Sequence, residues 1–330
     1  MKGSDTTIDR HRQSGEHGRT GEIAPHLGEW LEKYNRLMAA WLEKGGTQTP
    51  ATARDGLARL TQTLITDVPA MAFIKDEFLA EADHLIPVRV FHPEPTLVLP
   101  VLIYLHGGGH VAGSVAVFDP ICRKIALATK HLVIAVEYRL APEHPYPAGL
   151  QDGLAVVAGY RGLLQRMGLS HQPQLTLAGD SAGGAMAATL AHILQNQGTQ
   201  TISHLLLLYP SLDYTLSLPS VQALARGYFL EKERIEWFLQ QYFQNNEGRK
   251  EVSPLFMDVT VNFPPTLIVS AGFDPLKDEA LQYVRFLQEL GVDVHHVHFD
   301  DMIHAFLNME SLVPERCRAV YRTMADFLSR

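Results

Sequence analysis

Residues 179–183 read G-D-S-A-G, so that one serine, Ser181, stands between small residues at the end of an apolar run. The run from Leu175 to Ala178 predicts a buried strand, and the residues from Ala182 onward predict a helix. A serine on a sharp turn from a strand into a helix can act as a nucleophile. The helix start offers N–H groups and a positive dipole end to a developing oxyanion. We therefore predict Ser181 as the nucleophile and the Ala182 N–H as an oxyanion donor. The alternative is a helix cap made of small residues.

A second motif, H-G-G-G at residues 106–109, also follows an apolar run. Glycines let two successive N–H groups turn toward a substrate oxygen, so we expect Gly107 and Gly108 to join Ala182 in an oxyanion hole. The same stretch fits the G-x-G-x-x-[GA] fingerprint of dinucleotide-binding oxidoreductases, with Glu137 as the acid for the ribose. That alternative leaves the serine turn unexplained, and the oxyanion hole is favoured.

A serine nucleophile needs a histidine base and an acid that orients it. Asp274 directly follows a predicted strand and precedes a proline, whereas Asp278 falls in the first turn of the next helix, where it would complement the helix dipole. His304 lies beyond the following predicted strand. We expect Ser181 to attack, His304 to take and return the proton, and Asp274 rather than Asp278 to orient the imidazole.

Apolar runs and helix-like stretches alternate through most of the chain. This alternation predicts an α/β fold with a mostly parallel central sheet and helices on both of its faces. The predicted strands are 88–91, 101–105, 132–136, 175–178, 205–208, 267–269 and 292–299, and the predicted helices are 121–129, 153–167, 182–195, 279–290 and 316–328.

Two helical segments stand outside this alternation. One covers residues 23–64, and the other is an insert at 213–249 with a helix from about Glu231. All 3 tryptophans of the chain fall in these segments, which we expect to pack together as a cap over the sheet. The predicted division is 1–65 for the N-terminal segment and cap helices, 66–212 and 250–330 for the core, and 213–249 for the cap insert.

Composition limits the partners and the compartment. Lys and Arg number 28 against 36 Asp and Glu, and the net charge of −8 argues against nucleic acid or an anionic membrane as partner. No apolar run approaches the roughly 20 residues of a spanning helix. Residues 1–20 lack the apolar core of a signal peptide and are expected to be disordered. Cys122 and Cys317 form no CxxC motif, which suits a reducing cytoplasm.

Metal binding has one weak candidate pair. His296 and His298 share a face of a predicted strand, but the sequence offers no third ligand beside them. We therefore expect no metal.

Taken together, the motifs resemble the hormone-sensitive-lipase-like carboxylesterases of the α/β-hydrolase fold, the bacterial family IV, in its GDSAG branch. The resemblance spans roughly residues 85–328. It rests on H-G-G-G at 106–109, Y-R-L-A-P-E-H-P-Y-P-A at 138–148, G-D-S-A-G-G at 179–184, D-P-L at 274–276, and His304.

This resemblance implies a cofactor-free serine carboxylesterase that prefers short acyl chains and works through an acyl-enzyme intermediate. It implies a small-molecule ester as substrate and the roles already given to Ser181, Asp274 and His304. Dimers are common among such proteins. The further positions that match the family's motifs are the oxyanion donors Gly107, Gly108 and Ala182 and the supporting residues His106, Gly109 and Asp180.

Three positions depart from the family pattern. His110 stands where the family usually has an aromatic residue after the glycines, and Asp301 and Ala305 replace glycines near His304. A carboxylate at Asp301 would favour the charged imidazole, so we expect activity to shift toward alkaline pH.

Other functions on the same fold remain open at this point. Amidases, lactonases and peptidases use the same triad, whereas dehalogenases and epoxide hydrolases need an aspartate in place of Ser181. The plant hormone receptors that resemble this family lose the triad histidine, and His304 is present here.

Overall fold

The central element is a mixed β-sheet, seen in a computed structural model that describes residues 21–195 and 202–330. The expected disorder of residues 1–20 concerns residues outside this description. In the described residues the sheet has 8 strands in the order β1-β2-β4-β3-β5-β6-β7-β8. They are β1 (Phe73–Ala80), β2 (Leu85–His92), β3 (Leu99–Leu105), β4 (Leu132–Val136), β5 (His171–Asp180), β6 (His204–Leu208), β7 (Thr266–Phe273) and β8 (Val294–Ile303).

The strands from β4 to β8 pair in parallel, and β1 and β2 are antiparallel additions at one edge. Every residue of β4 is buried, as expected for a parallel strand covered on both faces. The predicted α/β architecture with a mostly parallel central sheet is thereby confirmed. Strand β1 was not predicted, because its charged centre, Lys75 to Glu77, belongs to a half-exposed edge strand and not to an apolar run.

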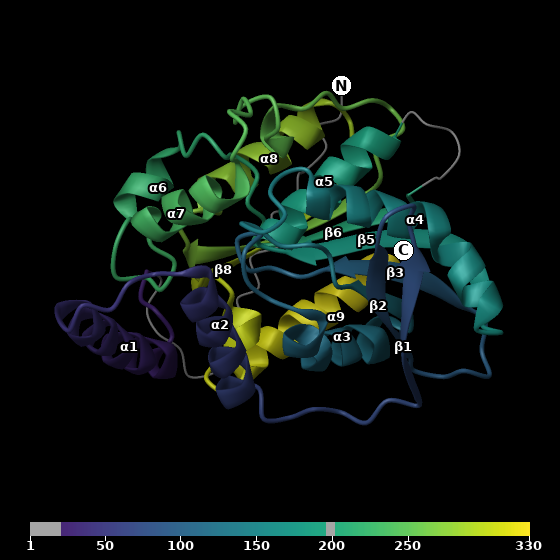
Figure 1. Cartoon of the computed structure of the whole chain (residues 1–330), viewed down its shortest axis with the longest axis horizontal. Helices are drawn as coiled ribbons and strands as arrows, with labels where there is room; N and C mark the ends of the chain where they lie inside the picture. The colour runs from purple at the N-terminus through teal and green to yellow at the C-terminus, as the bar shows by residue number, and fades with distance from the viewer. Residues whose placement is uncertain (1–20, 196–201) are drawn as a thin grey trace, which may run out of the picture.

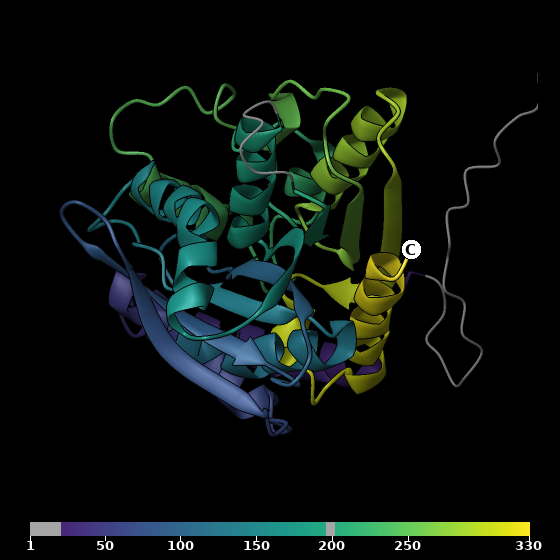
Figure 2. The same cartoon turned by 90° about the vertical axis from the view of Figure 1, so that its right-hand side faces the viewer.

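Helices cover both faces of the sheet (Figures 1 and 2). The helices α3 (Val115–Thr129) and α9 (Pro314–Leu328) pack on one face through one apolar cluster. On the other face α4 (Ala148–Arg166), α5 (Ala182–Leu194) and α8 (Lys277–Glu289) pack through a second cluster. Short 3₁₀ turns at Pro254–Phe256 and Phe306–Met309 complete the core.

Four further helices lie together beyond one end of the sheet, at the left of Figure 1. They are α1 (Pro25–Glu43) and α2 (Pro50–Leu64) from the N-terminal segment, and α6 (Pro219–Ala223) and α7 (Lys232–Tyr242) from the insert. The rings of Trp30 and Tyr34 on α1 contact Phe229 of the insert at centroid distances of 5.8 and 5.3 Å. The Asn35 side chain also donates to the Gly227 carbonyl at 3.0 Å. The two segments, called the cap segments below, therefore contact each other.

One arginine attaches helix α2 to the core. Arg54 donates to the carbonyls of Val111 and Ala141 at 2.9 and 3.1 Å, and it forms an ion pair with Glu143 at 2.6 Å. These partners lie in the loops after β3 and β4, so α2 is held beside the H-G-G-G motif.

In the part of the chain that the structure describes, none of the helices has the length and apolar character required to cross a membrane.

Candidate active site

Ser181 occupies the tight turn between β5 and α5. Its backbone has a positive φ of 52°, which strains a residue with a side chain. Two glycines make the turn possible through close approach: a Cβ on Gly183 would lie 2.0 Å from the Leu105 carbonyl oxygen, and one on Gly179 would lie 2.3 Å from the Gly183 carbonyl oxygen. The predicted strand–turn–helix around the serine is therefore present.

Three side chains form a continuous line of hydrogen bonds. The Ser181 hydroxyl lies 2.8 Å from Nε2 of His304, and Nδ1 of His304 lies 2.7 Å from Oδ2 of Asp274. The second carboxylate oxygen of Asp274 accepts the Leu276 N–H at 2.9 Å. A nucleophile, a base and an orienting acid stand in this order and at these distances in serine hydrolases.

The sheet explains how these residues meet. Ser181 follows β5, Asp274 follows β7 and His304 follows β8, and the carboxyl ends of parallel strands lie along one edge of a sheet. The rival acid has another partner, since Oδ2 of Asp278 accepts the Ser220 N–H at 2.8 Å. The structure thus brings Asp274, and not Asp278, to the imidazole.

The structure contradicts the role predicted for Gly107. Its N–H donates to Oδ1 of Asp180 at 2.7 Å, so it is not available to a substrate oxygen. Gly108 and Gly109 instead line the pocket beside Ser181 together with Ala182. Among the described residues, the N–H groups of these three have no acceptor. The candidate oxyanion donors are therefore Gly108, Gly109 and Ala182, one glycine further along the motif than expected. The sequence feature that could have indicated this is Asp180, the carboxylate directly before the nucleophile.

Buried polar contacts hold the supporting residues in place. The Tyr104 hydroxyl also donates to Oδ1 of Asp180 at 2.7 Å, and burial raises the pKa of Asp180 to about 6. The His106 ring is stacked against Phe118 and Tyr138 at 5.4 and 4.4 Å, with its Nδ1 donating to the Gly107 carbonyl at 2.9 Å. Burial lowers the pKa of His106 to about 4, so this ring is neutral at physiological pH.

A pocket opens over Ser181 and His304, and the two cap segments supply its outer wall. That wall is mostly apolar, and its residues from α2 and the insert are Ala53, Leu57, Tyr214, Phe229, Leu230, Arg234, Ile235, Phe238 and Leu239. His110 lines the pocket with its ring stacked 3.7 Å from Tyr242 and its Nε2 3.2 Å from the Tyr214 hydroxyl. The other nitrogen of His110 is buried and has no described partner.

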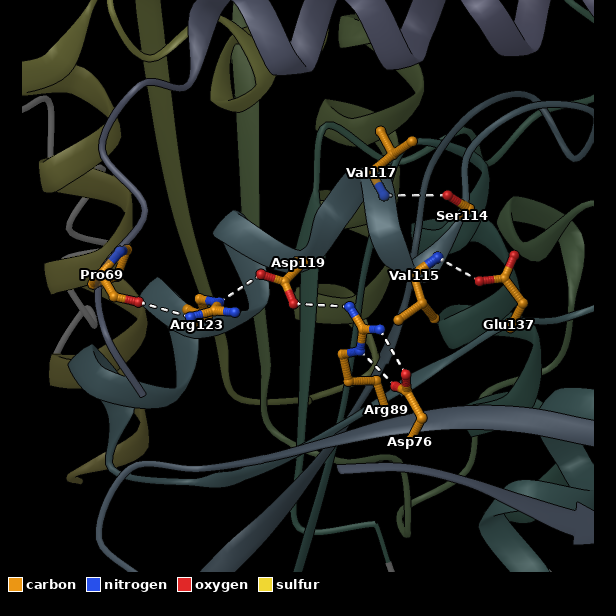
Figure 3. A network of polar contacts seen from close by, with 9 residues as sticks. All are labelled: Pro69, Asp76, Arg89, Ser114, Val115, Val117, Asp119, Arg123 and Glu137. Atoms are coloured by element: carbon orange, nitrogen blue, oxygen red, sulfur yellow. Dashed lines mark hydrogen bonds and ion pairs between the residues drawn. The ribbon is translucent and has the colours of Figure 1, made fainter. Parts of the chain in front are cut away.

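The dinucleotide-binding alternative required Glu137 to bind a ribose, but the structure gives this carboxylate another partner. Glu137 accepts the Val115 N–H at 2.7 Å at the start of α3, where Ser114 caps the same helix by accepting the Val117 N–H at 3.1 Å (Figure 3). Figure 3 also shows Arg89 joined to Asp76 and Asp119, which fastens strands β1 and β2 to α3. Glu137 therefore belongs to a helix cap and not to a ribose site.

The histidines considered as a metal site and the carboxylate of Asp301 all have other partners in the structure. His296 and His298 both contact the Ser270 hydroxyl at 2.8 Å, and the residues described contain no group of three or more His, Cys, Asp or Glu that could hold a metal. Asp301 forms an ion pair with Arg316 at 2.9 Å. The carboxylate that was expected to act on His304 therefore has a cationic partner of its own.

Comparison with known proteins shows to which family the chain belongs. The α/β hydrolase fold family matches residues 102–308. An ethyl acetate hydrolase of Pseudomonas putida is 36% identical over 249 residues, covering 73% of this chain and 78% of that protein. Carboxylesterase NlhH of Mycobacterium tuberculosis is 34% identical over 247 residues, covering 73% and 77%. The crystal structure of an α/β hydrolase enzyme from the metagenome of Lake Arreo is 30% identical with a TM-score of 0.84, and the match covers 94% of this chain and 98% of that chain.

The chain belongs to the α/β-hydrolase fold family. Its predicted place among the hormone-sensitive-lipase-like enzymes is confirmed, and it is a carboxylic-ester hydrolase.

Proposed function

We propose that this protein is a serine carboxylesterase that hydrolyses short-chain acyl esters through an acyl-enzyme intermediate on Ser181. The observation that carries the proposal is the hydrogen-bonded line from Ser181 through His304 to Asp274, with the serine facing an apolar pocket.

The first half of the reaction forms the acyl-enzyme. His304 accepts the hydroxyl proton on Nε2 while Oγ of Ser181 attacks the ester carbonyl carbon. The carbonyl oxygen becomes an oxyanion, which the N–H groups of Gly108, Gly109 and Ala182 stabilise. The tetrahedral intermediate then collapses, and the leaving alkoxide takes the proton from His304. Asp274 accepts a hydrogen bond from the Nδ1–H group of His304 throughout and stabilises the imidazolium while it exists.

The second half repeats these roles with water. His304 removes a proton from a water molecule, the hydroxide attacks the acyl carbonyl, and the same N–H groups stabilise the oxyanion. Ser181 leaves with the returned proton, and the carboxylic acid is released.

The cap segments support a preference for small esters. Phe229 and Phe238 from the insert and Leu57 from α2 line the space above the nucleophile, so bulky side chains limit the length of the bound chain. The name of the Pseudomonas putida relative, an ethyl acetate hydrolase, points in the same direction.

The test is a series of p-nitrophenyl esters from acetate to palmitate, assayed with wild type and Ser181→Ala. We expect kcat/KM to be highest for the short chains, and we expect Ser181→Ala to lose at least about 10³-fold in kcat. Thermal unfolding of the variant checks that it is folded. If Ser181→Ala loses only a few-fold, the proposed mechanism is wrong, and if neither protein cleaves any ester of the series, the proposed substrate class is wrong.

A further inference from the structure

The apolar wall of the pocket contains one full positive charge. Among the described residues that line the pocket, Arg234 of helix α7 is the only lysine or arginine. It lies on the outer wall with Phe229 and Phe238, in the same pocket as Ser181 and His304. Arg234 is partly buried there, and a cation partly removed from water favours a partner of opposite charge.

The acidic residues near Arg234 along the chain are bound elsewhere. Glu233 pairs with Arg226, Glu236 lies 3.7 Å from Lys232, and Glu231 accepts the Gly227 N–H at 2.8 Å. No carboxylate of the described residues forms an ion pair with Arg234. The charge of Arg234 is therefore not neutralised within this part of the chain.

The side chain of Arg234 is nevertheless held in a defined position. Its NH1 group donates to the Tyr34 hydroxyl at 3.2 Å. Its guanidinium carbon lies 5.9 Å from the ring centre of Phe229 and 5.7 Å from that of Phe238. These contacts use one of the five N–H donors of the guanidinium and leave the others available to a ligand. Aromatic neighbours restrict the head group and lower the entropy lost when it binds a second partner.

We propose that Arg234 binds a carboxylate carried by the substrate, so that the preferred substrates are short esters with a free carboxylate at the end remote from the scissile bond. The planar fork of a guanidinium matches a carboxylate with two parallel hydrogen bonds. The apolar wall accommodates the short methylene chain between the two groups. This inference rests on the proposed function, because it places the ester carbonyl at Ser181.

The test compares esters that differ in charge and share their chain length. Monoethyl glutarate against ethyl pentanoate examines a carboxylate on the acyl side, and 3-acetoxypropanoate against propyl acetate examines one on the alcohol side. We expect wild type to favour the anionic ester by about tenfold in kcat/KM in one of the pairs. The preference should fall as salt is raised, because the attraction is electrostatic.

Variants of Arg234 separate recognition from a merely structural role. Arg234→Met keeps an unbranched apolar side chain over the two rings, and we expect it to lose the anionic preference. Arg234→Lys should keep part of it. The matched control is Arg226→Met, an exposed arginine of the same insert that does not line the pocket, which should keep the wild-type ratio. An unchanged anionic-to-neutral ratio in Arg234→Met, or an equal loss on both esters with a lower melting temperature, overturns the proposal.

A binding measurement distinguishes this inference from the proposed function. In Ser181→Ala, calorimetry should detect tighter binding of monoethyl glutarate or 3-acetoxypropanoate than of its neutral counterpart, and adding Arg234→Met should abolish the difference. Selective binding without turnover by wild type would support Arg234 and contradict the catalytic proposal. Turnover of neutral esters without any preference for anionic esters would support the catalytic proposal and contradict the role of Arg234.

Discussion

The N–H of Gly107 donates to the carboxylate of Asp180, the residue directly before the nucleophile, at 2.7 Å. Since Tyr104 donates to the same oxygen at 2.7 Å, a single carboxylate joins strand β3, the H-G-G-G loop and the nucleophile turn. This contact turns the first glycine of the motif away from the substrate and leaves Gly108 and Gly109 to face the pocket.

Asp180 should make stability depend on pH in a particular direction. Burial raises its pKa from 3.8 to about 6 in the folded protein, so the folded state holds the proton more tightly than the unfolded state. The contribution of Asp180 to stability is therefore largest below about pH 4 and is lost as pH rises to about 6. Asp180→Asn cannot ionise and should gain about 2 kcal/mol relative to wild type between about pH 4 and pH 7.5.

Urea unfolding of both proteins at the two pH values measures this difference. Any hydrogen bonds that the amide gains or loses affect both pH values alike, so only the change with pH matters. A difference between variant and wild type that is the same at both pH values would contradict the raised pKa of Asp180.

The two candidate acids give a matched pair of catalytic variants. Asp274→Asn should lower kcat by about 10³- to 10⁴-fold, because the amide no longer holds the correct tautomer of His304. Asp278→Asn should change kcat by less than about threefold, since Asp278 bonds to the Ser220 backbone and not to His304. Steady-state assays with a short p-nitrophenyl ester distinguish them, and similar losses in both variants would refute the assignment of the acid.

His110 should make the protein sensitive to acid. Burial lowers its pKa from 6.5 to about 3 in the folded state, so the unfolded chain takes up a proton first as pH falls. The stability associated with neutral His110 is complete above about pH 6.5 and is lost progressively below it. His110→Phe cannot take up this proton and should gain about 2 kcal/mol over wild type between about pH 7.5 and pH 5.

Urea unfolding of the His110→Phe variant and wild type at these pH values is the measurement. The change of the difference with pH is decisive, because loss of the hydrogen bond to Tyr214 acts equally at both. If acidification destabilises the two proteins in parallel, His110 titrates normally and the prediction is wrong.

Asp301 should have little influence on the catalytic pH profile. Its carboxylate pairs with Arg316 at 2.9 Å, and its backbone carbonyl accepts the Ala24 N–H at 3.0 Å. We expect Asp301→Asn to leave the acidic limb of the kcat/KM profile in place and to reduce stability by about 0.5 kcal/mol, as is typical of a partly exposed ion pair. A displaced acidic limb would restore the direct electrostatic role that the sequence suggested.

Much of the fold is encoded in local patterns. Short apolar runs between helical periodicities predict parallel strands, because a strand buried on both faces has few polar residues. Strand β1 was missed for the same reason: it lies at the edge, and its polar centre carries no such pattern. The turn at Ser181 was recognisable because its requirements, small residues between a strand and a helix, are also local.

The sequence by itself determined which residues were present for the chemistry, namely Ser181, Asp274 and His304. It also determined that each of them follows a predicted strand, in this order along the chain. Only the tertiary structure decided which groups meet. It gave the N–H of Gly107 to Asp180, the carboxylate of Asp301 to Arg316, and the outer wall of the pocket to two segments far apart in the chain. The physical reason is that a hydrogen-bond or ion-pair partner is selected by packing between distant segments, as with His304 and Ser181, which are 123 positions apart. Residue spacing along one strand or helix does not predict which distant group will become the partner.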